Sequence, residues 1–124
     1  MLNRLSKYEK FFFLTIVLLN LVPLVIYRFF PTLDGPAHLY NANLIDYMLF
    51  HGDFDSFYQF NSEPVPNWTG HVLLCFFKSF LPGYLAEKML LLIYFIGLPY
   101  AFRNFVKSIN PGYIGLSYFI FPLT

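Results

Sequence analysis

The chain has 124 residues, of which 57% are hydrophobic, 23% aromatic and only 12% charged, whereas a typical soluble domain carries about 25% charged residues. Its 17 phenylalanines and 10 tyrosines are more than the core of so small a domain can bury, so an all-α membrane protein is expected. The net charge of +1 excludes a basic surface for nucleic acid, and the single cysteine, Cys75, excludes an internal disulfide.

The first predicted element is a membrane-spanning helix over residues 11–30. A short basic segment with Arg4, Lys7 and Lys10 precedes this run, which is long enough to cross about 30 Å of hydrocarbon. A cleaved signal peptide is the alternative, but its apolar region would span only about 7–15 residues and end in a site of small residues. We therefore predict an uncleaved anchor.

A large outer loop is predicted over residues 31–83. Residues 31–66 hold five acidic side chains and no lysine or arginine. Because positive charge is enriched on the cytoplasmic side of membranes, the N-terminus is predicted to be cytoplasmic and the loop external. Two helices lying along the membrane surface are expected within the loop, at about 36–50 and 67–81.

The residue pattern gives each of these two helices distinct faces. In the first helix an apolar stripe is formed by Leu39, Ala42, Ile45 and Leu49, and His38, Asn41 and Asp46 lie off it. In the second helix an apolar face is formed by Trp68, Val72, Cys75, Phe76 and Phe80, and a polar one by Asn67, His71 and Lys78. Two-faced helices of this kind are typical of the membrane interface.

A second span is predicted at 84–102 and the start of a further span at 112–124, so the chain reads as the N-terminal part of a longer helical bundle. Arg103 and Lys107 would be external if residues 67–81 crossed the membrane, and cytoplasmic if those residues lay flat. The enrichment of positive charge inside favours the flat helix.

This layout resembles the start of GT-C class integral membrane glycosyltransferases, such as the aminoarabinose and protein mannosyl transferases, which use sugars linked to dolichyl or polyprenyl phosphate. "LDGPAHLYNANLI" at 33–45 stands where those families carry an acidic motif of the form DE-x-x-Y-x-x-x-A. "SEPVPNWTGHVLLCFFKSFLPG" at 62–83 resembles their EKPPLxYWL stretch. The chain departs from the pattern at Gly35, where the second acid would stand, and it lacks the lysine after Glu63.

The resemblance implies a catalytic role for Asp34, as the base that takes a proton from the acceptor during sugar transfer. A carboxylate beside lipid is partly desolvated, which raises its pKa and makes it a better base. The alternative is a helix N-cap, because Asp followed by Gly-Pro and a helical pattern is a start signal. The two roles are compatible.

Further residues could contribute to substrate binding. His38, one turn after Asp34, could orient the carboxylate or help hold a divalent metal ion, and Asn41 could bind a sugar or a phosphate. Glu63 could be a second acid. The simpler interpretations are that His38 is an interfacial histidine, that Asn41 lies on a solvated helix face and that Glu63 is an ordinary loop carboxylate.

Three cations, Arg28, Lys78 and Lys88, are expected near the outer face, where one could stabilise a polyprenyl-phosphate leaving group. They could equally extend from lipid to water, as long basic side chains commonly do. In the resembling enzymes the main phosphate-binding residues lie further along the chain, so the segment alone is expected to be inactive.

Other short motifs carry little chemistry. Asp53 and Asp55 lack the glycine and glutamate that an EF-hand requires, so they are expected to be solvated turn residues. Asn67-Trp68-Thr69 matches a glycosylation pattern, but Trp68 is expected to face lipid. No spacing of Cys and His predicts a zinc site.

Two non-enzymatic functions compete with the glycosyltransferase. A transporter or flippase would place polar groups at mid-membrane, whereas here they gather in the outer loop. A non-catalytic membrane subunit stays open. The bacterial inner membrane, with residues 31–83 periplasmic, is the preferred location, and the endoplasmic reticulum is the alternative.

Overall fold

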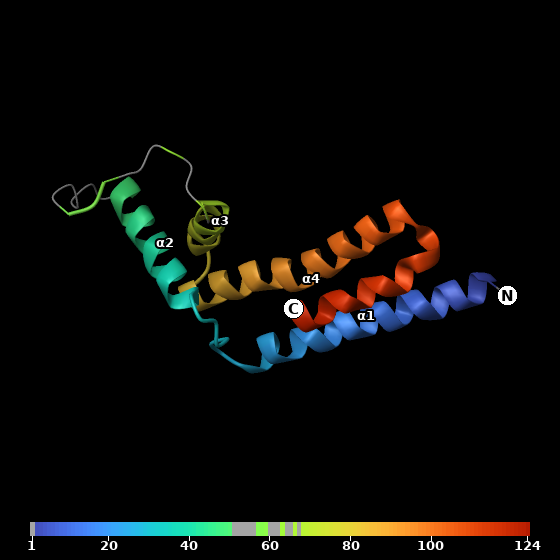
Figure 1. Cartoon of the computed structure of the whole chain (residues 1–124). Coiled ribbons are helices and arrows are strands. Elements are labelled where there is room, and N and C mark those ends of the chain that lie inside the picture. Colours follow the sequence, from blue (N-terminus) through green and yellow to red (C-terminus); the bar gives the residue numbers. More distant parts are fainter. Residues whose placement is uncertain (1, 51–56, 60–62, 64–65, 67) are drawn as a thin grey trace. The chain divides into compact units, whose positions relative to one another are not determined.

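The computed structural model describes residues 2–50, 57–59, 63, 66 and 68–124, and within them the predicted all-α class is confirmed (Figure 1). The described elements are four α-helices, α1 (Leu2–Ile26), α2 (Gly35–Phe50), α3 (Trp68–Lys78) and α4 (Gly83–Ile109), and a 3₁₀ helix, η1 (Pro111–Leu123). Two helical segments, Lys7–Ile26 and Gly83–Ile109, are long and apolar enough to cross a membrane.

The chain divides into two compact units. The long-helix unit consists of Met1–Arg28 and Leu91–Thr124, and the short-helix unit of Phe29–Leu90. Helix α4 therefore contributes its first turns to the short-helix unit and the remainder to the long-helix unit.

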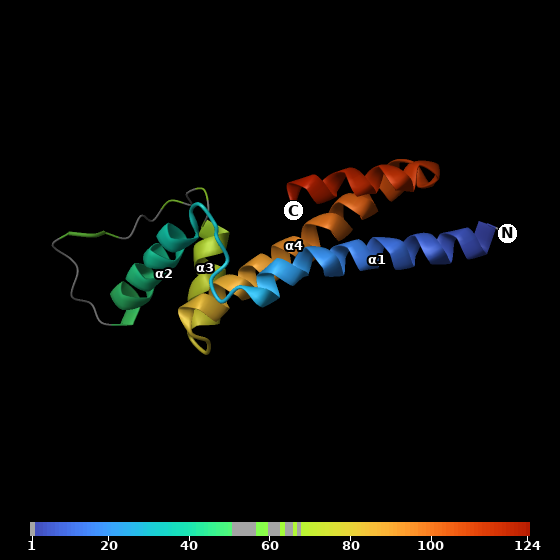
Figure 2. The ribbon, with the colours of Figure 1, turned by 90° about the horizontal axis from the view of Figure 1, so that it is seen from below.

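In the long-helix unit, α1 and η1 run in one direction and α4 in the opposite one (Figures 1 and 2). Phe13 of α1, only 1% exposed, joins all three helices. Its ring centroid lies 5.6 Å from that of Tyr100 on α4, and 5.5 Å and 5.2 Å from those of Tyr118 and Phe121 on η1. Such aromatic pairs stabilise by about 0.5–1.5 kcal/mol beyond the area they bury.

A bidentate ion pair fixes the register of α1 against α4. The guanidinium of Arg103 donates to both carboxylate oxygens of Glu9, at 2.7 and 2.5 Å. The hydroxyl of Tyr118 donates to the same carboxylate at 3.1 Å, and the guanidinium carbon lies 4.3 Å from the centroid of the Phe13 ring. Residue 9 thus lies level with residue 103.

Helix α1 ends at Ile26, earlier than the end predicted for the span at 11–30. The span was predicted from hydrophobicity, which indicates whether a segment can lie in lipid but not at which residue its helix ends. Pro31 disfavours a helical conformation at Phe30, and the N–H of Thr32 bonds the Phe30 carbonyl at 2.9 Å instead.

Helix α4 starts after Pro82 and continues to Ile109, beyond the span predicted at 84–102. Arg103 does not end the helix, because arginine is a good helix former, and its charge is compensated by Glu9. The helix ends before Asn110 and Pro111, where proline disfavours a helical conformation at the preceding residue.

The segment expected to begin a further span at 112–124 is the 3₁₀ helix η1, with a kink at Tyr113. Asn110 caps its start by accepting a hydrogen bond from the N–H of Gly112 at 2.9 Å. Near its end the amide of Asn20 on α1 donates to the Thr124 hydroxyl at 3.4 Å. The segment therefore packs along α1.

The core of the short-helix unit lies between α2 and α3, which pack side by side (Figures 1 and 2). Ala42 of α2 is fully buried there, and Leu74 and Phe77 of α3 are nearly so. Ala86, also fully buried, adds the start of α4 to this core. The small side chain of Ala42 allows α2 and α3 to approach closely, because it adds only a methyl group between them.

The apolar stripe of α2 is buried only in part, and one residue of α3 lies on a different face from the one predicted. Leu49, in the apolar stripe of α2, is 61% exposed, because α3 packs against the part of α2 around Ala42. Cys75, expected on the exposed apolar face of α3, is half-buried and its thiol donates to the Ala42 carbonyl at 3.4 Å. Its position four residues after His71 places it on the polar face instead.

We predict that the Glu9–Arg103 pair is a major source of stability in the long-helix unit. Glu9→Gln should lower the free energy of unfolding by roughly 3 kcal/mol, since it leaves the buried Arg103 guanidinium without its counter-charge. The measurement is thermal unfolding of the purified protein in detergent.

A double-mutant cycle with Arg103→Met supplies the control. The two losses should not add, because removal of both charges also removes the buried unpaired one. The more exposed ion pair of Asp46 provides a comparison, and Asp46→Asn should cost less than about 1 kcal/mol. Additive losses for Glu9 and Arg103 would contradict the prediction.

Candidate functional site

The candidate site lies in the short-helix unit, where α2 begins. Asp34 immediately precedes α2, and its carbonyl accepts the first helical hydrogen bond, from the N–H of His38 at 3.0 Å. This is the N-cap position. The side chain is exposed and its carboxylate bonds no other described residue, so capping by the carboxylate is not seen. Pro36 contributes to this, because it removes one of the N–H groups that a cap would bind.

Gly35 allows the start of α2 to lie against the start of α4. The Thr32 hydroxyl donates to the Glu87 carboxylate at 2.9 Å, and this pair lies directly beside the Gly35 Cα. A Cβ on residue 35 would overlap both the hydroxyl and the carboxylate. The position next to Asp34 therefore requires glycine.

His38 and His71 form a contact that joins α2 to α3. The Nδ1 atom of His38 lies 3.1 Å from Nε2 of His71, so one ring donates its N–H and the other accepts. The pKa of His71 is lowered because burial disfavours the charged ring and because His38 lies next to it. The contact between the two rings therefore joins α2 to α3.

Lys78 also faces α2. Its ammonium lies 3.8 Å from the carboxylate of Asp46, and its side chain is only 13% exposed. The positive charge of Lys78 is thus compensated within the unit. This placement makes Lys78 a weaker candidate for binding a phosphate than its sequence position suggested.

The remaining candidates come from different segments of the chain. Asn41 is exposed on α2, and Glu63 is exposed in the segment between α2 and α3. Arg28 is exposed but belongs to the long-helix unit. Lys88 is half-buried on α4. The predictions for Asp53, Asp55 and Asn67 lie outside the described residues.

The described residues hold no group of three or more His, Cys, Asp or Glu side chains suited to a metal ion. The His38–His71 pair could supply two nitrogen ligands, and a metal site usually needs at least one more protein ligand.

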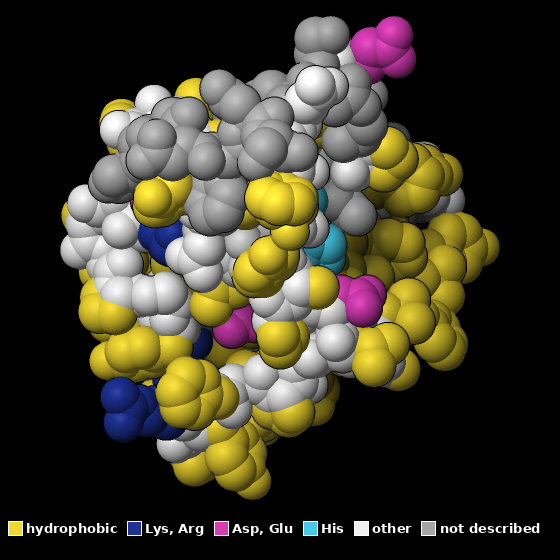
Figure 3. Space-filling view, turned by 90° about the vertical axis from the view of Figure 1, so that its left-hand side faces the viewer, with side chains coloured by type: hydrophobic (Ala, Val, Ile, Leu, Met, Phe, Trp, Pro, Cys, Tyr) yellow, Lys and Arg dark blue, Asp and Glu magenta, His cyan; other side chains and the backbone are white. Residues whose placement is uncertain are grey.

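One face of α3 presents large apolar side chains to the surroundings. These lie at a helical spacing of four and are at least 37% exposed: Trp68, Val72, Phe76 and Phe80. Figure 3 shows acidic and histidine side chains at the surface of the molecule among hydrophobic ones. The arrangement is amphipathic, as the sequence predicted for these four residues.

The sequence indicated most of the polar residues of the two short helices, but not which of them contact one another. His71 and Lys78 were assigned to the polar face of their helix, and His38 and Asp46 lay off the apolar stripe of theirs. The complementary polar faces were the available signal. Glu87 was missed as part of the site, because its partner Thr32 lies 55 positions away in the sequence.

No protein-family model matches this chain, and neither a curated protein nor a solved structure is significantly similar to it.

We predict that Gly35→Ala destabilises the start of α2. The added Cβ would displace Thr32 and Glu87, at a cost of about 1–3 kcal/mol in the free energy of unfolding. Gly70→Ala is the matched control, because a Cβ there meets no atom within 4 Å and should be neutral or stabilise α3 by up to about 1 kcal/mol. Equal effects of the two substitutions would contradict the assignment.

We predict a pH dependence that comes from His71. Its pKa is lowered in the folded state, so the unfolded chain binds more protons just below the usual value of about 6.5. The stabilising effect is present above about pH 6.5 and is lost as the pH falls through the lowered pKa. Thermal unfolding followed by fluorescence of Trp68, the only tryptophan, measures it.

His71→Gln is the control for this effect, because glutamine can still hydrogen-bond His38 but does not titrate. The loss of stability between about pH 8 and about pH 5.5 should shrink in this variant. An unchanged pH dependence would show that other groups cause it.

Proposed function

We propose that the chain is the N-terminal part of a membrane glycosyltransferase of the GT-C type, with Asp34 as the general base. The donor is a sugar linked to polyprenyl phosphate, and transfer takes place on the outer face of the membrane, by preference the periplasmic face of a bacterial inner membrane. The observation that carries the proposal is the exposed carboxylate of Asp34 at the start of a short helix between two long apolar ones.

The antiparallel arrangement of α1 and α4 supports the topology. Because Glu9 contacts Arg103, both residues lie on the same side of any membrane that the two helices cross. Helix α3 has 11 residues and is about 16 Å long, too short to cross about 30 Å of hydrocarbon. The residues between the two spans then lie on the side opposite the N-terminus.

The exposed apolar face of α3 supports a location in the interface. Val72, Phe76 and Phe80 would enter the lipid, while His71 and Lys78 pack against α2. Trp68 at the start of the helix is a residue type that favours the headgroup region. The short-helix unit would then lie where a lipid-linked sugar is presented.

The position of Glu87 supports an acidic site, although the chain has Gly35 where the motif of the resembling enzymes has its second acid. In the resembling enzymes a second acid follows the first in sequence. Here Gly35 stands in its place, and the Glu87 carboxylate from α4 lies beside the glycine. We infer that Glu87 supplies the second acidic group near Asp34.

In the proposed reaction Asp34 accepts the proton of an acceptor hydroxyl as the oxygen attacks the anomeric carbon. The bond between that carbon and the phosphate oxygen breaks, and its electron pair leaves with the polyprenyl phosphate. Cations elsewhere in the protein must stabilise this leaving group, because Lys78 is already paired with Asp46.

We predict that Asp34→Asn in the full-length protein lowers turnover by at least about 100-fold, because an amide cannot accept the acceptor proton. The assay follows sugar transfer from a polyprenyl-phosphate-linked donor. Glu87→Gln should give a smaller loss, since its carboxylate is expected to support the site rather than take the proton.

Asp46→Asn is the matched control, because it makes the same chemical change within the helix that Asp34 precedes, and its turnover should be near normal. Near-normal turnover of Asp34→Asn would reject Asp34 as the base. An equal loss in Asp46→Asn would show that the effect arises from folding.

A further inference from the structure

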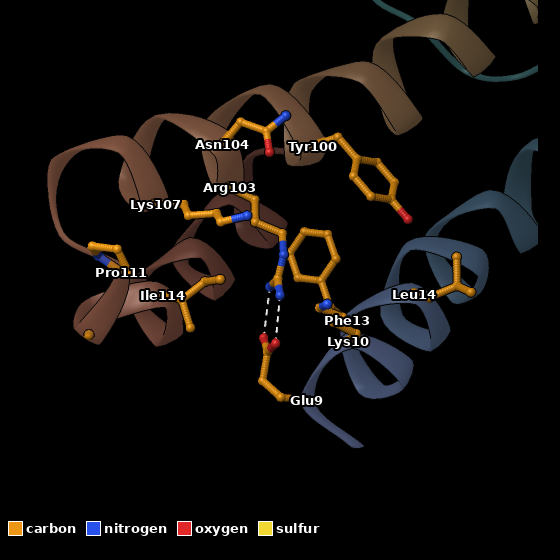
Figure 4. Close-up of a pocket in the computed structure, with 11 residues that line it drawn as sticks. Glu9, Lys10, Phe13, Leu14, Tyr100, Arg103, Asn104, Lys107, Pro111 and Ile114 are labelled. Atoms are coloured by element: carbon orange, nitrogen blue, oxygen red, sulfur yellow. Dashed lines mark hydrogen bonds and ion pairs between the residues drawn. The ribbon is translucent and has the colours of Figure 1, made fainter. Parts of the chain in front are cut away.

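A second feature of the protein is a cavity in the long-helix unit, near the Glu9–Arg103 pair. Its volume is about 910 Å³, within the range of small-molecule sites. Residues of α1, α4 and the start of η1 line it (Figure 4). Its floor includes the turn at Pro111 and Gly112.

The polar part of the cavity is positively charged. Lys10, Arg103 and Lys107 line it together with a single carboxylate, that of Glu9. Arg103 is neutralised by Glu9 through two hydrogen bonds. Lys10 and Lys107 form no ion pair with another described residue, so two positive charges remain for a ligand. The amide of Asn104 adds a neutral hydrogen-bonding group.

The other part of the cavity is apolar. Phe13, Leu14 and Tyr100 form its wall along the helices, and Ile114 contributes from η1 (Figure 4). Leu14 is 41% exposed and Tyr100 is 38% exposed, so both can contact a ligand. Lysines without an ion-pair partner among the described residues lie in one cavity with apolar side chains, which matches an anionic amphiphile.

We propose that this cavity binds an anionic phospholipid, with its phosphate at Lys10 and Lys107 and an acyl chain along Leu14 and Tyr100. Basic pockets between membrane helices on the cytoplasmic side commonly bind anionic headgroups. The proposal rests on the membrane location and topology proposed above, which place residues 10 and 107 on the cytoplasmic side. It does not depend on Asp34 or on sugar transfer.

The chemistry favours this occupant over two others. A zwitterionic phospholipid would place its own ammonium group beside the two lysines, which opposes binding. A small soluble anion such as phosphate would leave the apolar wall exposed to water and gain nothing from it.

The test measures lipid binding to the purified full-length protein in detergent. Phosphatidylglycerol and phosphatidylcholine with the same acyl chains are added separately, and bound lipid is counted by native mass spectrometry. Phosphatidylglycerol should bind at least about ten-fold more tightly. Lys10→Gln should weaken its binding roughly five-fold, and Lys10→Gln with Lys107→Gln about twenty-five-fold.

Matched variants separate charge from fold. Lys7→Gln removes a lysine one turn earlier on α1, outside the cavity lining, and should change binding less than about two-fold. Lys10→Arg with Lys107→Arg keeps both charges and should retain binding. All variants should unfold at temperatures close to that of the parent protein.

Three results would overturn the proposal. Equal binding of the two lipids, or unchanged phosphatidylglycerol binding in the double glutamine variant, would show that the cavity does not select an anionic headgroup. Displacement of the lipid by an equal concentration of inorganic phosphate would assign the cavity to a soluble anion. Sugar transfer can be normal or absent in each case, so failure here is distinct from failure of the Asp34 assignment.

Discussion

The bidentate pair between Glu9 and Arg103 is the interaction on which the arrangement of the long helices depends. It joins residues 94 positions apart, and it compensates an arginine that is only 8% exposed. Without its counter-charge, Arg103 would be costly to bury among aromatic side chains such as Phe13. The pair therefore determines that α4 returns along α1, and that the two ends of the hairpin lie level.

Polar contacts of a different kind join the short helices. The His38–His71 contact and the ion pair of Asp46 with Lys78 both connect α2 to α3, one turn before and one turn after the buried Ala42. Because these polar groups are used between the helices, α3 directs its aromatic face outward. The contact between the two helices thus combines a small apolar core with two polar pairings, while the outer face of α3 is apolar.

Much of the fold could be predicted from local sequence patterns, but the contacts between residues far apart in the sequence could not. The apolar runs and proline positions indicated the segments where α1 to α4 lie, because hydrophobic period and proline act within a few residues. They did not indicate that α1 begins at Leu2 or that residues 111–123 form a 3₁₀ helix. The end of α1 at Ile26 was missed, since composition does not set where a helix ends. The contacts Glu9–Arg103 and Thr32–Glu87 were missed because opposite charges far apart in sequence give no signal of which ones meet. The function of Asp34 stays a prediction.

In the proposed topology α1 and α4 cross the membrane as a hairpin, with the short helices on the outer side. Its most direct test places single cysteines at positions 7, 34 and 107 of a Cys75→Ser background and labels intact cells with a membrane-impermeant maleimide. Position 34 alone should be labelled in intact cells, and positions 7 and 107 only after the membrane is opened. Labelling of 107 from outside, or protection of 34, would contradict it.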